Sequence, residues 1–311
     1  MWFKNLRCYR FSDTFTLAEN FDTLLAEQAF RPCGRTEVTS FGWVSPFAAN
    51  RHGAEATAAP VFSHRIGDNV LLCARKEEKV LPNSAVQAQL DEKIEAIQAE
   101  TGRVVGRKEK QSLKEDLVHQ MLPQAFSKYQ ATWLFISLSQ QVVFVDAASA
   151  NRAEDVLALL RGSLGSLPVK PLLAEQPLEG LLTEWLRSQQ LPAGLVFGDE
   201  IELRAAAVKG DDAPAVIRCR QQDLSSDEMQ IHLAHDKQVT KLGLVWRDRL
   251  SFVLDTDVVC KRLQMTDVLA DSRDDLVDPS AEQKLDADFA LLAGELNALY
   301  PELCQWLAEH A

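Results

Sequence analysis

The sequence lacks the features that mark membrane, disulfide-bonded and zinc-binding proteins. No apolar run in its 311 residues approaches the roughly 20 residues that a membrane-spanning helix needs. The start, MWFKNLRCYRFS, alternates large and polar residues where a secretory signal would have a basic stub and an apolar block. The six cysteines include no C-x-x-C pair and mostly lie in apolar runs, which is typical of reduced core residues. We therefore expect a cytoplasmic protein that has no membrane partner.

Motifs of the common enzyme classes are also missing. The stretch GRVVGRK has three residues between its glycines, and Glu109 follows Lys108, whereas a phosphate-binding loop needs four residues and then Lys-Ser or Lys-Thr. His232 and His235 lie three residues apart with no further His or Cys nearby, which favours ordinary residues over metal ligands. No G-x-S-x-G motif and no Cys–His pairing stands out. We therefore predict a protein that is not an enzyme and that needs no cofactor or metal.

An acidic pair near the C-terminus keeps an enzymatic alternative open. Asp286 and Asp288 in LDADF have the side chains that a metal-dependent nuclease would use to bind its metal. Their segment, residues 266–311, holds eleven acidic and two basic residues, however, and such a charge run usually forms a solvated helix face. The solvated face is the favoured interpretation, and the metal-dependent enzyme is the alternative.

Positive charge is scarce and gathered in a few places. The chain has 33 Lys and Arg against 45 Asp and Glu, a net charge of −12, yet residues 101–114 hold five basic residues and one acid. Because the screening length at physiological salt is about 8 Å, a basic patch acts locally even on an acidic protein. Three clusters qualify: Arg75, Lys76 and Lys79 after a strand; Arg103, Arg107, Lys108, Lys110 and Lys114; and Arg218 and Arg220, which alternate onto one face of a strand. We predict that these residues bind a polyanion such as DNA through its phosphates, since no helix-turn-helix or aromatic-rich signature indicates base reading.

Hydrophobic periodicity predicts an α+β fold with antiparallel sheets and helices packed on one face. Two-residue spacing and turn residues predict hairpins in VFSHRIGDNVLLCARK, around Gly67, and in TWLFISLSQQVVFVD and VTKLGLVW…LSFVLD. The C-terminal stretch spaces Leu285, Phe289, Leu292, Leu296 and Leu299 as a buried helical stripe, with a break expected at Pro301. We predict four modules: an N-terminal α+β module at 1–82, a helical arm at 83–130, a central α+β module at 131–208 and a C-terminal α+β module at 209–311.

The predicted arm consists of two amphipathic helices. Val86, Leu90, Ile94 and Ile97 form the apolar face of the first helix, and the second is expected to begin at Ser112, with Glu115 completing a capping box. Arg103, Arg107, Lys108 and Lys110 would then lie in the connection between the helices. Because a thin projection is expected to leave such apolar faces uncovered, the arm favours two-fold pairing with a second copy.

Longer stretches resemble a known family. MWFKNLRCYRFS, FGWVSPF, CARKEEKVLP, SLKEDLVHQMLPQAFSKY, DVLALLRGSLGSLPV, VTKLGLVW and LDADFALLAGELNAL all resemble, in order and over nearly the whole chain, the recombination-associated RdgC proteins. The resemblance implies a nucleoid-associated protein without enzymatic activity that binds duplex and single-stranded DNA with little sequence preference and restrains RecA. It also implies horseshoe-shaped subunits that form a ring-shaped dimer around duplex DNA.

Three hypotheses follow from these observations. The first is a homodimeric, sequence-nonspecific DNA-binding protein that modulates recombination. The second is the metal-dependent nucleic-acid enzyme that uses the C-terminal carboxylates. The third is a protein–protein scaffold whose arm docks a partner and whose basic clusters are incidental.

Overall fold

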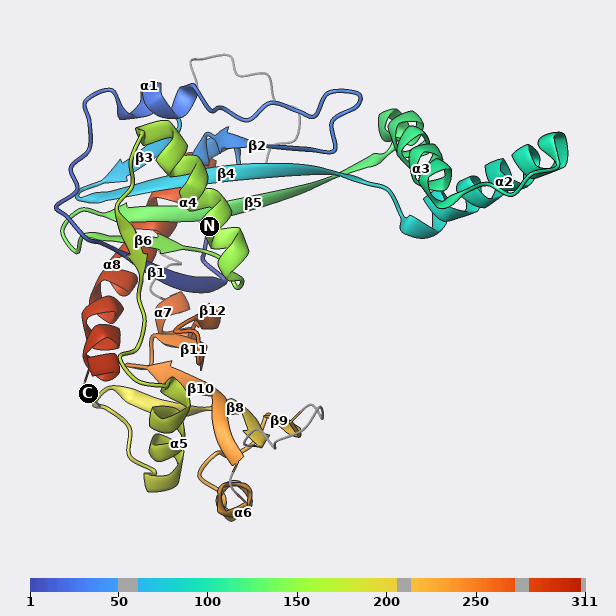
Figure 1. Cartoon of the computed structure of the whole chain (residues 1–311). Coiled ribbons are helices and arrows are strands. Elements are labelled where there is room, and N and C mark those ends of the chain that lie inside the picture. Colours follow the sequence, from blue (N-terminus) through green and yellow to red (C-terminus); the bar gives the residue numbers. More distant parts are fainter. Residues whose placement is uncertain (50–60, 206–213, 236, 272–279, 309–311) are drawn as a thin grey trace. The chain divides into compact units, whose positions relative to one another are not determined.

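The computed structural model describes residues 1–49, 61–205, 214–235, 237–271 and 280–308. It confirms an α+β architecture with a large antiparallel sheet (Figure 1). The strands are β1 (Asn5–Phe11), β2 (Thr39–Val44), β3 (Ser63–Ile66), β4 (Asn69–Val80), β5 (Phe126–Ser137), β6 (Val142–Val145), β7 (Val169–Pro171), β8 (Leu195–Ala205), β9 (Val216–Arg220), β10 (Lys237–Trp246), β11 (Leu250–Asp255) and β12 (Cys260–Met265). The helices are α1 (Phe21–Ala26), α2 (Asn83–Thr101), α3 (Arg107–Met121), α4 (Ala150–Leu164), α5 (Leu178–Ser188), α6 (Asp227–Ala234), α7 (Asp267–Asp271) and α8 (Ala281–Ala308), with 3-10 turns η1 (Pro46–Ala48) and η2 (Leu122–Gln124).

The chain divides into two compact units that interleave in sequence. The larger unit comprises Met1–Phe21, Ser63–Leu72 and Thr132–Ala311, and the smaller unit comprises Asp22–Phe62 and Cys73–Ala131. Strands β4 and β5 each run from one unit into the other. The expected four-module division of the chain stays a prediction.

The strands pair in an order that brings distant parts of the sequence together. Over the described residues, hydrogen-bonded neighbours follow β2-β4-β5-β6-β1-β12-β11-β10-β8-β9, with β3 beside β4 and β7 beside β1. The three predicted hairpins are confirmed as β3–β4, β5–β6 and β10–β11. Gly67 occupies the turn of the first hairpin at φ 56°, a left-handed conformation that glycine adopts without steric cost.

Helix α8 supplies much of the core of the larger unit. All five residues of the predicted stripe are buried, and the ring centroid of Phe289 lies 5.5 Å from that of Phe135 on β5. The expected break at Pro301 is wrong, because α8 continues to Ala308. Proline removes one backbone donor, but Leu303 and Trp306 are buried beyond it, and this packing favours continuation of the helix. Within the described ranges, no helix combines the length and the apolarity that crossing a membrane requires.

Gly42 in β2 lets residues 28–30 approach the backbone of that strand closely. A Cβ atom at Gly42 would lie 2.6 Å from the backbone nitrogen and Cα of Phe30. The approaching segment is fixed by two hydrogen bonds, from the Phe30 amide to the Trp43 carbonyl at 2.8 Å and from the Trp43 amide to the Gln28 carbonyl at 2.9 Å. Any larger residue at position 42 would push these segments apart, which gives the FGWV motif a structural reason.

Helices α2 and α3 form the predicted arm. They lie in the smaller unit, after the end of β4 and before the start of β5 (Figure 1). Gly102 ends α2 in the left-handed conformation at φ 69°, and Gly106 is the N-cap of α3. The helices pack on each other through one apolar cluster: Leu90, Ile94, Val105 and Leu117, with Ile97 and Leu113 half-buried beside them. The expectation that these apolar faces stay uncovered is therefore wrong. The connection folds Val105 back into the cluster, so that the arm has a small core of its own.

Candidate nucleic-acid interface

The structure places the predicted basic residues in three settings. The arm group consists of Arg103, Arg107, Lys108, Lys110 and Lys114 in the smaller unit. The strand-end group, Arg75, Lys76 and Lys79, was predicted to follow a strand, but β4 continues to Val80, so all three residues lie within it in the same unit. Arg218 and Arg220 lie on β9 in the larger unit.

Most of the arm group belongs to a helix. The predicted start at Ser112 is wrong: α3 begins at Arg107, and the Lys110 amide donates to the carbonyl of Gly106 at 2.9 Å. Glycine at the N-cap suffices to start the helix, although this cap provides no side-chain acceptor. Arg107, Lys108 and Lys110 therefore lie in its first turn, where the helix dipole disfavours positive charge.

The members of the arm group differ in how far their charges are neutralised. Arg103 donates two hydrogen bonds to the Glu109 carboxylate, at 2.7 and 2.6 Å, and these bonds lower the pKa of Glu109. Arg107, Lys108 and Lys110 are exposed, and among the described residues they form no ion pair. Three cations of the arm group are thus available to a polyanion.

The strand-end group is engaged with its own unit. Arg75 is 8% exposed; its Nη2 donates to the carbonyls of Ala48 and Ala49 at 3.1 and 2.7 Å, and its guanidinium lies 5.6 Å from the ring centroid of Phe30. This geometry gives Arg75 a structural role, because a contact with phosphate would require it to leave these partners.

The lysines of the strand-end group each lie beside a glutamate. Lys76 Nζ lies 3.7 Å from Glu78, and Lys79 Nζ lies 3.8 Å from Glu77. Burial raises the pKa of Glu77, but hydrogen bonds from Ser127 Oγ at 2.6 Å and from the Cys33 amide at 2.8 Å outweigh it and keep the pKa below its usual value. The buried carboxylate therefore stays charged and draws Lys79 toward the protein.

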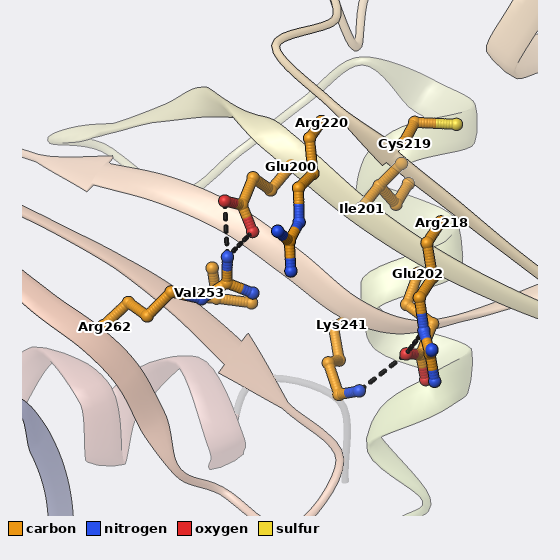
Figure 2. Close-up of a pocket in the computed structure, with 9 residues that line it drawn as sticks. All are labelled: Glu200, Ile201, Glu202, Arg218, Cys219, Arg220, Lys241, Val253 and Arg262. Atoms are coloured by element: carbon orange, nitrogen blue, oxygen red, sulfur yellow. Dashed lines mark hydrogen bonds and ion pairs between the residues drawn. The ribbon is translucent and has the colours of Figure 1, made fainter.

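Arg218 and Arg220 line a shallow pocket on the exposed face of the C-terminal strands. Both project from the same face of β9, as the alternation in IRCR predicted. Lys241 from β10 and Arg262 from β12 join them around a volume of about 180 Å³ (Figure 2). With Glu200 and Glu202 as the acidic lining residues, the pocket holds four cations against two carboxylates.

An adjoining hollow of about 490 Å³ shares Glu202 and Lys241 with this pocket, and it adds the cations Arg204 and Lys261 and the carboxylates of Glu179, Asp255 and Asp257. We call the six cations of the two hollows the sheet-face group: Arg204, Arg218, Arg220, Lys241, Lys261 and Arg262. Four of the six were not predicted. Which strands neighbour β9 depends on pairing over long sequence distances, so alternation within β9 could not bring these four cations beside Arg218 and Arg220.

Carboxylates lie directly among the sheet-face cations. Glu202 is 3% exposed and accepts hydrogen bonds from Lys241 Nζ at 2.6 Å, Arg218 Nε at 2.8 Å and Thr240 Oγ1 at 3.1 Å. Burial raises the pKa of Glu202, but these hydrogen bonds outweigh it and lower the pKa to about 2. Glu202 therefore carries a full negative charge at neutral pH beneath the cations.

The second carboxylate of the pocket, Glu200, also holds an arginine. Glu200 pairs with Arg262, a residue whose backbone has the left-handed φ of 53°. Figure 2 shows the Arg220 side chain reaching over the same face between this pair and Lys241. Arg220 has no ion-pair partner within the described part of the chain, so its guanidinium can accept an external anion.

The acidic pair of the enzymatic alternative is occupied by other partners. Asp286 is exposed and lies 2.8 Å from His64 Nε2. Asp288 is buried and pairs with the amino group of Met1, so the predicted solvated face is wrong at Asp288. Among the residues that the structure describes, no group of three or more His, Cys, Asp or Glu side chains is arranged to hold a metal ion. His232 lies in the last turn of α6 and His235 follows it as the C-cap.

Comparison with known proteins gives a consistent result over the full length. Residues 1–310 match the family model described as "Putative exonuclease, RdgC". A "Recombination-associated protein RdgC" of Aeromonas hydrophila is 45% identical over 304 residues, which cover 97% of this chain and 96% of the relative. Proteins of the same name from Yersinia pestis and Yersinia pseudotuberculosis are 43% identical over 312 residues, covering 100% of this chain and 99% of each relative. The chain therefore belongs to the RdgC family.

Proposed function

We propose that this protein binds duplex and single-stranded DNA without sequence preference, encircles duplex DNA as a homodimeric ring, and modulates recombination by limiting the access of RecA to DNA. The observation that carries the proposal is the pocket of Figure 2, where four cations, Arg218, Arg220, Lys241 and Arg262, are gathered with two carboxylates in a chain whose net charge is −12. Such a local concentration of positive charge attracts a polyanion even when the whole protein is acidic.

The chemistry of the pocket favours phosphate over bases. Its lining contains three arginines and one lysine, which donate well to phosphate oxygens, and it contains no aromatic side chain on which a base would stack. Contacts to phosphate position a protein on DNA but carry no sequence information. The expected interaction is therefore nonspecific and strongly dependent on salt.

The role in recombination is supported by the names of the relatives, which describe them as recombination-associated. A protein that covers duplex or single strands nonspecifically competes with any other protein that must load on the same DNA. We propose RecA as that competitor and the nucleoid as the place where the competition occurs.

The proposed dimer is supported by apolar residues that the smaller unit leaves exposed. The apolar faces of α2 and α3 cover each other, but Val104 is 82% exposed and Phe126 is 86% exposed. Large exposed side chains of this kind are suited to contact with a second copy. Light scattering should report twice the chain mass of 34.7 kDa, and a monomer at micromolar concentration would contradict the ring.

The test of DNA binding is a salt titration with duplexes of equal length and unrelated sequence. Log affinity should fall linearly with log salt by about 0.9 for each neutralised phosphate, and all sequences should give the same line. Encirclement has a separate test, because a closed ring loaded on circular duplex should resist a high-salt wash but should leave linear duplex through its ends. Strong preference for one sequence, or equal loss from both forms, would contradict the proposal.

The two other hypotheses have outcomes of their own. Products of DNA cleavage in the presence of Mg²⁺ or Mn²⁺ that vanish when Asp286 and Asp288 are changed to Asn would establish the enzymatic alternative. Failure of the wild-type protein to bind any DNA would leave the scaffold hypothesis, in which the arm docks a protein.

A further inference from the structure

The centre of the sheet-face group is an ordered row of charges across neighbouring strands. Arg218 on β9 lies opposite Glu202 on β8, and Glu202 lies opposite Lys241 on β10. Lys241 in turn lies opposite Asp255 on β11. Each carboxylate thus has a cation beside it, an arrangement that favours the antiparallel pairing itself.

The middle of this row is buried, while Arg218 beside it is open to solvent and Lys241 is half-buried. Glu202 is 3% exposed, whereas the side chain of Arg218 is 68% exposed. A break in the register between β8 and β10 lies at Thr240, between Val239 and Lys241. This bulge lets Thr240 and Lys241, two successive residues of β10, both reach the same carboxylate.

The atom that Arg218 uses is informative. An isolated arginine–carboxylate pair commonly forms two parallel hydrogen bonds, which occupy most of the guanidinium fork. Here the Glu202 carboxylate accepts from Nε at 2.8 Å, and the terminal Nη1 and Nη2 groups of Arg218 have no other recorded partner among the described residues. Since guanidinium has five N–H donors, four remain for a second anion.

We propose that Glu202 is a positioning residue, whose buried carboxylate holds Arg218 by Nε and Lys241 by one N–H so that their remaining donors face a phosphate of the DNA backbone. The inference rests on the proposed function, because it names which residues of the sheet face are held in place for phosphate. A carboxylate fixes a metal-binding histidine in the same way, by occupying the donor that points away from the ligand. In this arrangement a negative charge close to the interface strengthens DNA binding.

Two charge-conserving substitutions test the role of the arginine fork. Arg218→Lys keeps the charge, but an ammonium group on a flexible stem cannot use separate Nε and Nη donors for Glu202 and phosphate. Arg220→Lys is the matched control, because Arg220 lies on the same strand and face but has no carboxylate partner among the described residues. We expect Arg218→Lys to lower duplex affinity about tenfold, the equivalent of one lost charge-assisted contact, and Arg220→Lys to lower it clearly less.

Glu202→Gln tests the carboxylate itself. If Glu202 only offsets positive charge, its removal should tighten binding and steepen the salt dependence. If it positions Arg218 and Lys241, binding should weaken, and in the Arg218→Lys background the effect of Glu202→Gln should shrink to the part that acts through Lys241, as a double-mutant cycle measures. Circular dichroism establishes whether Glu202→Gln is folded. If it is not folded, the comparison of Arg218→Lys with Arg220→Lys decides whether Arg218 is held in place for phosphate.

The outcomes separate this inference from the function on which it rests. Salt-dependent duplex binding by the wild type, with equal affinities for Arg218→Lys and Arg220→Lys, or tighter binding by folded Glu202→Gln, overturns the positioning role alone. A wild-type protein that binds no duplex overturns both proposals.

Discussion

Replacing Arg107 and Lys108 together by glutamate is expected to weaken DNA binding without weakening the fold. Both residues are exposed in the first turn of α3, directly after its N-cap Gly106. The helix dipole disfavours positive charge and favours negative charge at this end, by about 0.3–1 kcal/mol for each charge at low salt. The double substitution removes two unfavourable charges and adds two favourable ones, so it should stabilise α3 by about 1–4 kcal/mol at low salt.

The effect on DNA binding should have the opposite sign. If both cations contact phosphate, their loss removes two neutralised phosphates and flattens the slope of log affinity against log salt by about 1.8. Two repulsive charges are added as well, so affinity should fall more than tenfold near physiological salt. Titration of a fluorescent duplex at several salt concentrations gives both quantities, and amide hydrogen exchange in α3 gives its local stability.

Lys284→Glu is the matched control. Lys284 is exposed in the first turn of α8, where Ser280 before the helix and Gln283 within it form a reciprocal capping box. The same dipole argument predicts a slightly more stable helix, but this acidic segment is not expected to contact DNA. If the variant with glutamate at positions 107 and 108 keeps the wild-type affinity and salt slope, the arm does not contact DNA. If amide hydrogen exchange in its α3 is faster than in the wild type, the dipole argument is wrong.

Three further predictions concern stability and reactivity. Leu117→Ala should destabilise the arm core by about 2–4 kcal/mol, and amide hydrogen exchange should become faster only in residues 83–121. Unchanged amide exchange in these residues would contradict an independent core. Because the pKa of Glu202 lies at about 2, below its unfolded value near 4.5, its contribution to stability is present above pH 4.5 and lost as pH falls toward 2. Glu202→Gln should therefore flatten the acid side of the stability curve, and identical acid profiles would count against the buried ion cluster. Burial raises the pKa of the Cys8 and Cys260 thiols, so a water-soluble thiol reagent at pH 8 should label them only after unfolding; labelling of the native protein would contradict their burial.

The elements that the sequence predicted correctly depend on local signals. Gly67 permits a tight turn between two alternating runs, and the stripe from Leu285 to Leu299 repeats at helical spacing. The start of α3 was misplaced because Ser112 and Glu115 imitate a capping box inside the helix, whereas the actual N-cap is Gly106.

Features that depend on distant contacts were not predictable in the same way. Periodicity identified the apolar faces of the arm helices but could not show that they cover each other with Val105 between them. Alternation correctly placed Arg218 and Arg220 on one face, but Lys241 joins them only through strand pairing and the bulge at Thr240. Glu202 was not considered as a functional residue, because a lone glutamate in a strand gives no sign that it lies beneath three cations.

The arm group and the sheet-face group present their positive charges in opposite ways, and we infer different tasks from this difference. In the arm group, three exposed cations lie at a helix start where the dipole opposes them, so their charge is available to a distant polyanion but their side chains are not held in place. In the sheet-face group, buried carboxylates reduce the net charge but fix the direction of the donors. Because unpaired charges act over about a screening length of 8 Å at physiological salt, the arm group is suited to attracting DNA and the sheet-face group to holding its phosphates. We therefore expect the arm variant to lower mainly the association rate and the Arg218 variant to raise mainly the dissociation rate, which stopped-flow mixing separates.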